Sequence, residues 1–266
     1  MTITNRLLMF RPARADLPVY GLICAWLLAM ITVPLLRAFV GDAGLGLGVA
    51  LTVILQAAAV FAIVNRAWGL RRTLAALAAI ALATWAAEAV GSRTGFPFGY
   101  YYYTDRLQPQ LLDVPLLIPL AWFMMLPPAW AVAQVLTGTR RRAAFVAVSA
   151  LALTAWDLFL DPQKVAWGFW VWTDGERTQV FTGGYFGVPW VNFLGWLATA
   201  ALVTVLVRPA RLPALPLLLI YTLVWLFQSM GQLFFWNLPG PAIAGFIGMG
   251  IIVVMAWRAL LREQRT

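Results

Sequence analysis

About eight long apolar segments follow one another along the chain, separated by short polar or glycine- and proline-rich stretches. An apolar run of about 18 residues or more with few charges is typical of a membrane-spanning helix. The segments lie at residues 17–37, 45–65, 73–91, 115–137, 143–161, 189–207, 213–236 and 241–260. The pattern predicts an all-α, polytopic integral membrane helical bundle. Because no polar stretch is long enough for a separate fold, residues 1–266 are predicted to form one domain.

Basic residues gather in alternate gaps between these segments, which predicts how the chain crosses the membrane. Lys and Arg favour the cytoplasmic side of a membrane. Fourteen of the nineteen basic residues fall on one predicted side: Arg6, Arg11, Arg14, Arg66, Arg71, Arg72, Arg140, Arg141, Arg142, Arg208, Arg211, Arg258, Arg262 and Arg265. We therefore expect a multi-pass protein of the cell membrane with both termini in the cytoplasm. This topology accounts for the net charge of +9 and argues against nucleic acid as a partner.

The residue types restrict the chemistry. The chain has no histidine and one cysteine, which excludes His-ligated zinc, haem, Ser-His-Asp triads and a disulfide within the chain. No metal site is predicted. The one lysine, Lys164, is expected in a loop, which argues against a retinal-type Schiff base in a late helix. Catalysis would then depend on carboxyl, amide, hydroxyl, guanidinium and aromatic groups.

Three carboxyl groups lie near the predicted outer ends of apolar segments. Glu88 lies in the third segment, and Asp157 and Asp161 lie four residues apart in the fifth, on one helix face. Asn192 and Gln228 fall at a similar depth in later segments. A charge inside a membrane costs several kcal/mol, so such residues mostly face a bundle interior or a cavity. Structural alternatives are a carboxylate bonded to an amide or to Arg93, or Asp161 ending a helix before Pro162.

Aromatic side chains surround the same level, and two long outer stretches, 92–114 and 162–188, could form lids. An aromatic belt at the interface explains many of these rings. Trp85, Trp122, Trp156 and Tyr102 are nevertheless candidates for a pocket, since a ring face stabilises a desolvated cation by about 2 kcal/mol. A buried carboxyl group tends to keep its proton and can act as a general acid. The combination favours proton-initiated carbocation chemistry on an alkene, with proton-coupled transport as the main alternative.

Several segments resemble the carotenoid biosynthesis membrane family, which includes bisanhydrobacterioruberin hydratase and carotenoid 1,2-hydratase. The resemblance is carried by EAVGSRTGFPFGYYYYT (88–104), DVPLLIPLAWFMM (113–125), AWDLFLDPQ (155–163) and GGYFGVPWVNFLGW (183–196). It implies addition of water across the terminal 1,2 double bond of an acyclic carotenoid end group, giving a tertiary alcohol. No cofactor is implied. The implied partners are a lipid-soluble carotenoid, water, membrane lipid and other enzymes of the carotenoid pathway.

For this reaction the acid cluster motivates a set of roles. Asp157 is the first choice to protonate the less substituted alkene carbon, and Glu88, Asp161 or Asn192 would hold the attacking water. Trp156 or Trp85 would face the tertiary cation, with Trp122, Tyr102 and Gln228 also binding the substrate. A carotenoid or terpenoid cyclase would use the same protonation, and the sequence separates it poorly from a hydratase. A prenyltransferase would need two Asp-rich metal motifs, whereas Asp157 and Asp161 offer at most one.

Overall fold

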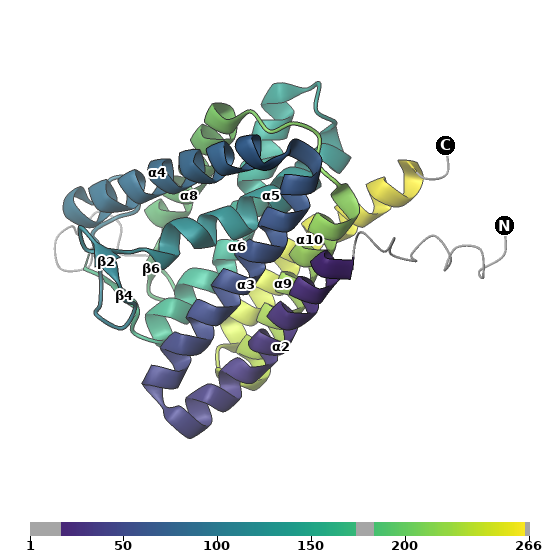
Figure 1. Ribbon diagram of the computed structural model, residues 1–266. Helices are drawn as coiled ribbons and strands as arrows, with labels where there is room; N and C mark the ends of the chain where they lie inside the picture. The colour runs from purple at the N-terminus through teal and green to yellow at the C-terminus, as the bar shows by residue number, and fades with distance from the viewer. Residues whose placement is uncertain (1–16, 174–183, 264–266) are drawn as a thin grey trace.

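A computed structural model describes residues 17–173 and 184–263 of the chain (Figure 1). Within them lie eight helices, each long and apolar enough to cross a membrane, which confirms the predicted fold class. They are α2 (Leu17–Val40), α3 (Asp42–Trp68), α4 (Leu70–Thr94), α5 (Leu117–Thr137), α6 (Arg142–Ala166), α8 (Trp190–Val207), α9 (Ala214–Phe234) and α10 (Pro239–Glu263). Arg6, Arg11, Arg14, Arg177 and Arg265, used in the topology prediction, lie outside the described residues.

The helices pack side by side around α5, which contacts α3, α4, α6, α9 and α10. Most of α5 is buried, including a run from Trp122 to Ala133. A helix that is apolar on all sides belongs in the interior of a bundle. α2 lies at the edge of the bundle, where it packs mainly against α3 (Figure 1). The first turn of α2 and the last turn of α10 lie at the same end of the bundle.

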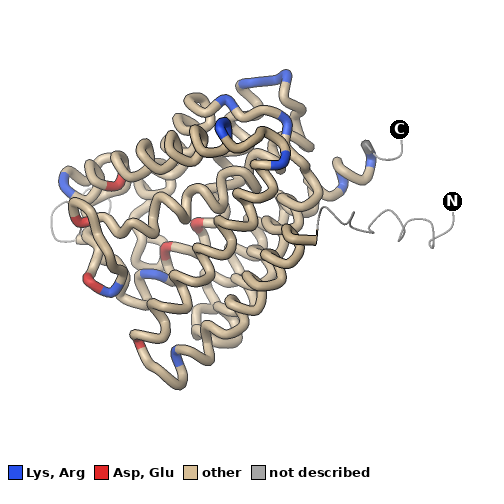
Figure 2. Tube along the Cα trace, viewed as in Figure 1, with Lys and Arg blue, Asp and Glu red and all other residues tan. Residues whose placement is uncertain are grey.

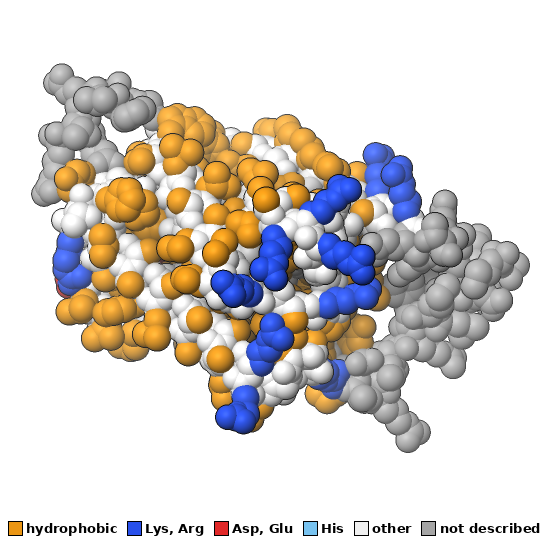
Figure 3. Space-filling view, turned by 90° about the horizontal axis from the view of Figure 1, so that it is seen from above, with side chains coloured by type: hydrophobic (Ala, Val, Ile, Leu, Met, Phe, Trp, Pro, Cys, Tyr) orange, Lys and Arg blue, Asp and Glu red, His pale blue; other side chains and the backbone are white. Residues whose placement is uncertain are grey.

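Most of the described Lys and Arg residues lie toward that end (Figure 2). Figure 3 shows Lys and Arg side chains gathered on one part of the surface, with apolar side chains over much of the rest. Hydrogen bonds tie the connections together there. The indole N–H of Trp68 donates to the Arg211 carbonyl at 3.2 Å. The Gln134 amide exchanges two bonds of 2.9 Å with the Leu212 backbone. Successive described helices therefore run in alternate directions between an arginine-rich end and an opposite end.

The opposite end is covered by short antiparallel strand pairs, which the sequence did not predict. β1 (Tyr101–Tyr103) pairs with β4 (Trp170–Trp172), β2 (Gln110–Leu111) with β3 (Val114–Pro115), and β5 (Gly184–Tyr185) with β6 (Val188–Pro189). Residues 95–116, 167–173 and 184–189 are called the lid below. The β1–β4 pairing joins the connection after α4 to the connection after α6.

Helix α6 continues through Pro162, so the expectation that it ends at Asp161 is wrong. Proline leaves the carbonyl four residues earlier without its helical partner. That carbonyl belongs to Leu158, and the hydroxyl of Tyr185 in the lid donates to it at 3.0 Å. A replacement donor of this kind allows proline inside a membrane helix. The placement of Lys164 in a loop is wrong for the same reason: it lies in α6 and is buried.

The lid packs closely on α8 at Gly195. A Cβ atom there would lie 2.6 Å from the Pro97 carbonyl oxygen and 2.7 Å from Cδ1 of Phe98. Contacts this short require either glycine or a displacement of the lid backbone.

Gly195→Ala is therefore expected to lower the free energy of unfolding by about 1–3 kcal/mol, the usual range for overpacking. The measurement is thermal unfolding of the detergent-solubilised protein. Gly21→Ala is the matched control, because a Cβ at Gly21 in α2 meets nothing within 4 Å. Equal stability of the two variants would contradict the close packing of lid and α8.

Candidate active site

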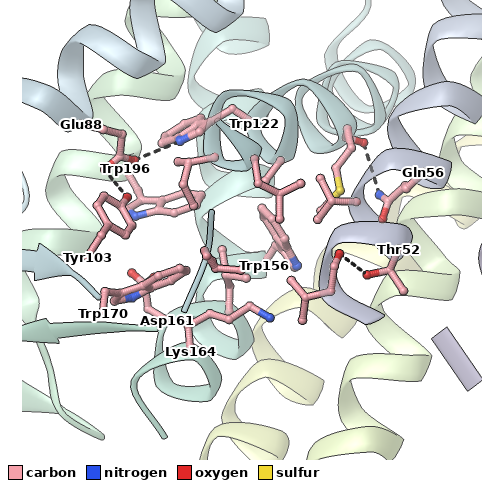
Figure 4. Close-up of a pocket in the computed structure, with 18 of the residues that line it drawn as sticks. Thr52, Gln56, Glu88, Tyr103, Trp122, Trp156, Asp161, Lys164, Trp170 and Trp196 are labelled. Atoms are coloured by element: carbon pink, nitrogen blue, oxygen red, sulfur yellow. Dashed lines mark hydrogen bonds between the residues drawn. The ribbon is translucent and has the colours of Figure 1, made fainter. Parts of the chain in front are cut away.

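A central cavity of about 90 Å³ lies between the helices beneath the lid. Its walls come from α2, α3, α4, α5, α6, α8, α9 and the lid. Of the residues predicted for a site, it is lined by Glu88, Asp161, Trp122, Trp156, Asn192 and Gln228. Figure 4 shows Glu88, Trp122 and Asp161 around one part of this cavity, with Thr52 and Gln56 across from them. Helices distant in the sequence thus bring most of the predicted side chains together.

Glu88 is buried in α4 with 4% of its surface exposed, and it accepts three side-chain hydrogen bonds. Its carboxyl group receives the hydroxyls of Tyr101 and of Tyr103, the latter at 2.8 Å, and the Trp122 indole N–H at 3.2 Å. Three donors directed at one carboxyl group stabilise its negative charge. The alternative that Glu88 pairs with Arg93 is wrong, because Arg93 forms its ion pair with Asp113 at 3.3 Å.

The two tyrosines come from β1, where successive side chains point to opposite faces. Tyr101 and Tyr103 face the cavity, whereas Tyr102, the predicted substrate-binding residue, is 51% exposed and does not line it. Burial, and then the adjacent Glu88 carboxyl, raise the pKa of both Tyr101 and Tyr103 well above the usual value. Both phenols therefore remain neutral hydrogen-bond donors at physiological pH.

Asp157 and Asp161 form a second acidic group, one helical turn apart in α6. The amide nitrogen of Asn192 in α8 donates to Oδ2 of Asp157 at 2.9 Å and to Oδ2 of Asp161. The shared Asn192 nitrogen brings the two carboxyl groups close together. Asp161 lines the central cavity, whereas Asp157 is fully buried behind it. Oδ1 of Asp157 has no hydrogen-bond partner in the part of the chain that the structure describes.

Tryptophan rings form much of the cavity wall. Trp122 stacks on Trp196 with 4.3 Å between ring centroids, and Trp156 meets Trp196 edge to face at 5.9 Å. The indole nitrogen of Trp156 is buried and has no partner within residues 17–173 and 184–263, so it can donate a hydrogen bond to a molecule in the cavity. Trp85, also predicted for the site, does not line the cavity; it donates to the Leu111 carbonyl at 3.1 Å.

The sequence analysis missed Lys164, which lines the same cavity. Its Nζ lies 4.1 Å from the ring centroid of Trp167 and 5.6 Å from that of Phe169, distances typical of cation–π contacts. A helix periodicity continued past Pro162 would have placed Lys164 on the face of Asp161, three residues earlier. In the described residues, no group of three or more His, Cys, Asp or Glu side chains is arranged to hold a metal ion.

Comparison with known proteins relates this chain to carotenoid metabolism. Over 152 residues it is 36% identical to the bisanhydrobacterioruberin hydratase of Haloarcula japonica, an alignment that covers 56% of this chain. The match spans about half of that relative, 47% of its length. No solved structure matches the chain. A family described as carotenoid biosynthesis protein matches residues 48–252. This range includes α4, α5, α6 and α8 with their acidic residues. The chain therefore belongs to this family.

Proposed function

We propose that this protein is a carotenoid hydratase that adds water across the terminal 1,2 double bond of an acyclic carotenoid, giving a tertiary alcohol. The observation that carries the proposal is that Glu88 and Asp161, two carboxyl groups with different hydrogen-bond partners, line one aromatic cavity, with Asp157 beside Asp161. The Haloarcula relative, a bisanhydrobacterioruberin hydratase, supports hydration as the reaction class. Bond making then needs only an acid, a base and a water molecule.

The aspartate pair is the proton donor in this proposal. One Asn192 nitrogen bonds to both carboxyl groups, so Asp157 and Asp161 lie close together in a buried site. Two negative charges repel each other there, so we expect the pair to hold one proton. Asp161 lines the cavity, and we assign it the transfer to the less substituted alkene carbon. Asp157, the first choice from the sequence, is assigned the part of its proton-sharing partner, because it lies behind Asp161.

Glu88 is the base. Its three hydrogen-bond donors favour the carboxylate, which can stabilise the tertiary cation that remains after protonation. The rings of Trp122, Trp156 and Trp196 face the same space and add cation–π stabilisation. A water molecule held by Glu88 attacks the cation, and Glu88 takes the proton that the water loses. That proton returns to the aspartate pair before the next turnover.

The size of the cavity favours hydration over ring closure. A cavity of about 150 Å³ accommodates benzene, whereas the central cavity has only about 90 Å³. A carotenoid end group folded into a six-membered ring, with its methyl substituents, has a larger cross-section than an extended end group. A narrow cavity therefore favours the extended end group. Cyclisation therefore remains the second candidate, and product analysis separates it from hydration.

Expression in a bacterial host that accumulates an acyclic carotenoid is expected to yield a pigment heavier by one water molecule. Chromatography with mass spectrometry measures this product, and its tertiary hydroxyl should resist acetylation. A host with the empty vector is the control. A pigment of unchanged mass with a ring would favour the cyclase, and unchanged pigment would contradict both enzymes.

Asp161→Asn, Asp157→Asn and Glu88→Gln are each expected to lower turnover by at least about 100-fold, because each removes a group from proton transfer. Each substitution keeps the shape of the side chain, and elution of the purified variant in detergent checks that it is folded. Asp113→Asn is the control, since Asp113 is exposed and pairs with Arg93 outside the cavity. Turnover at the wild-type rate by Asp161→Asn would refute its assignment as donor.

We also propose that the protein resides in the cell membrane with its arginine-rich end in the cytoplasm, as the positive-inside rule favours. In a Cys24→Ser background, a cysteine at Thr139 should react with a membrane-impermeant maleimide only in inverted vesicles. A cysteine at Asp42, beyond the other end of α2, should react only in intact spheroplasts. The reverse pattern would contradict this orientation.

A further inference from the structure

The central cavity is too small for the substrate that the proposed function requires. Its volume of about 90 Å³ is below the roughly 150 Å³ that holds benzene. A carotenoid is many times longer than one ring. If its end group reacts beside Glu88 and Asp161, the remaining polyene must leave the cavity through one of its walls. This inference rests on the proposed function, and it concerns where the polyene chain of the substrate lies.

A second cavity, of about 370 Å³, adjoins the first on the side away from Glu88. It lies between α2, α9 and the last turns of α6, and we call it the lateral groove. Five residues line both spaces: Met30, Val49, Thr52, Lys164 and Gln228. Thr52 lies across the central cavity from Glu88 (Figure 4). The two spaces are therefore separated only by the side chains of these shared residues, which we call the junction.

The lateral groove opens toward the lipid-facing side of the bundle. Three of its apolar lining residues are largely exposed: Ile31 by 53%, Met230 by 52% and Phe235 by 61%. One of its walls is α2, which packs mainly against α3 and is mostly not buried. In a membrane these positions meet acyl chains, so an apolar ligand can pass between groove and bilayer without crossing water.

Two of the polar side chains at the junction, Thr52 and Lys164, already have partners. The Thr52 hydroxyl donates to the Val49 carbonyl at 2.8 Å. The Lys164 ammonium lies over the Trp167 ring, so its methylene stem is available as an apolar wall. A hydrocarbon chain passing this point therefore does not separate these two groups from their partners.

We propose that the lateral groove binds the extended polyene chain of the carotenoid, and that the substrate enters sideways from the bilayer between α2 and α9. The end group passes the junction at Thr52 and Lys164 and reaches Glu88 and Asp161. The rest of the chain lies along Met30, Phe227 and Met230 and continues into the lipid. The protein thus binds one end of its substrate, and the length of the polyene beyond the groove does not affect binding.

Photolabelling of the full-length protein in liposomes tests this route. The probe is an acyclic carotenoid analogue with an intact dimethyl-alkene terminus and a diazirine in the middle of its chain. Peptide mapping should find the label on α2 and α9 residues of the lateral groove. Thr52→Phe narrows the junction and should reduce this labelling several-fold. Ile54→Phe is the matched control, because Ile54 lies two residues away on α3 and is 49% exposed.

The outcomes separate the two proposals. Label confined to the groove and sensitive to Thr52→Phe supports the route, even if no hydrated product forms and the proposed function fails. Label on α8 or α10, or equal labelling of the two variants, would overturn the route while leaving hydration intact. A saturated acyl probe of the same length should label the groove weakly. If it labels as strongly as the polyene, the groove holds only membrane lipid and the inference is wrong.

Discussion

The structure depends on keeping three carboxyl groups inside an apolar bundle. An unpaired buried charge is so costly that every such group needs hydrogen-bond partners. Glu88 receives them from the lid and from α5, and Asp157 and Asp161 receive theirs from α8. These partners come from segments far apart in the sequence. The three carboxyl groups therefore obtain their hydrogen bonds only when the lid, α5 and α8 assemble around one point. Chemistry can occur at the same point.

The sequence was sufficient for the helices and for most of the acidic site. Apolar length predicted all eight described spans, with differences of a few residues at their ends. The cost of burying Glu88, Asp157, Asp161 and Asn192 predicted that they face inward, since lipid offers them no partner. That the whole chain forms a single domain stays a prediction.

The structure places three residues differently from the prediction made from the sequence, and each difference has a physical cause. In the run Tyr100–Tyr103, the two-residue period of a strand assigns alternate side chains to the cavity, but it does not say which alternate set faces inward. Tyr102 was chosen, and its neighbours bind Glu88. Lys164 was placed in a loop because Pro162 normally ends a helix, and the compensating hydroxyl of Tyr185 lies 23 positions away along the chain. Trp85 lies three residues before Glu88 in α4, but its indole N–H is bonded to the Leu111 carbonyl and the residue does not line the cavity.

The bond from Tyr185 to Leu158 also restricts how the protein can move. Lifting the β5–β6 hairpin would remove the hydrogen bond that the Leu158 carbonyl receives in place of its helical partner. The part of the lid above the aspartates is thereby tied to the helix that carries them. A large substrate is then left to enter from the side of the bundle, where α2 packs mainly against α3.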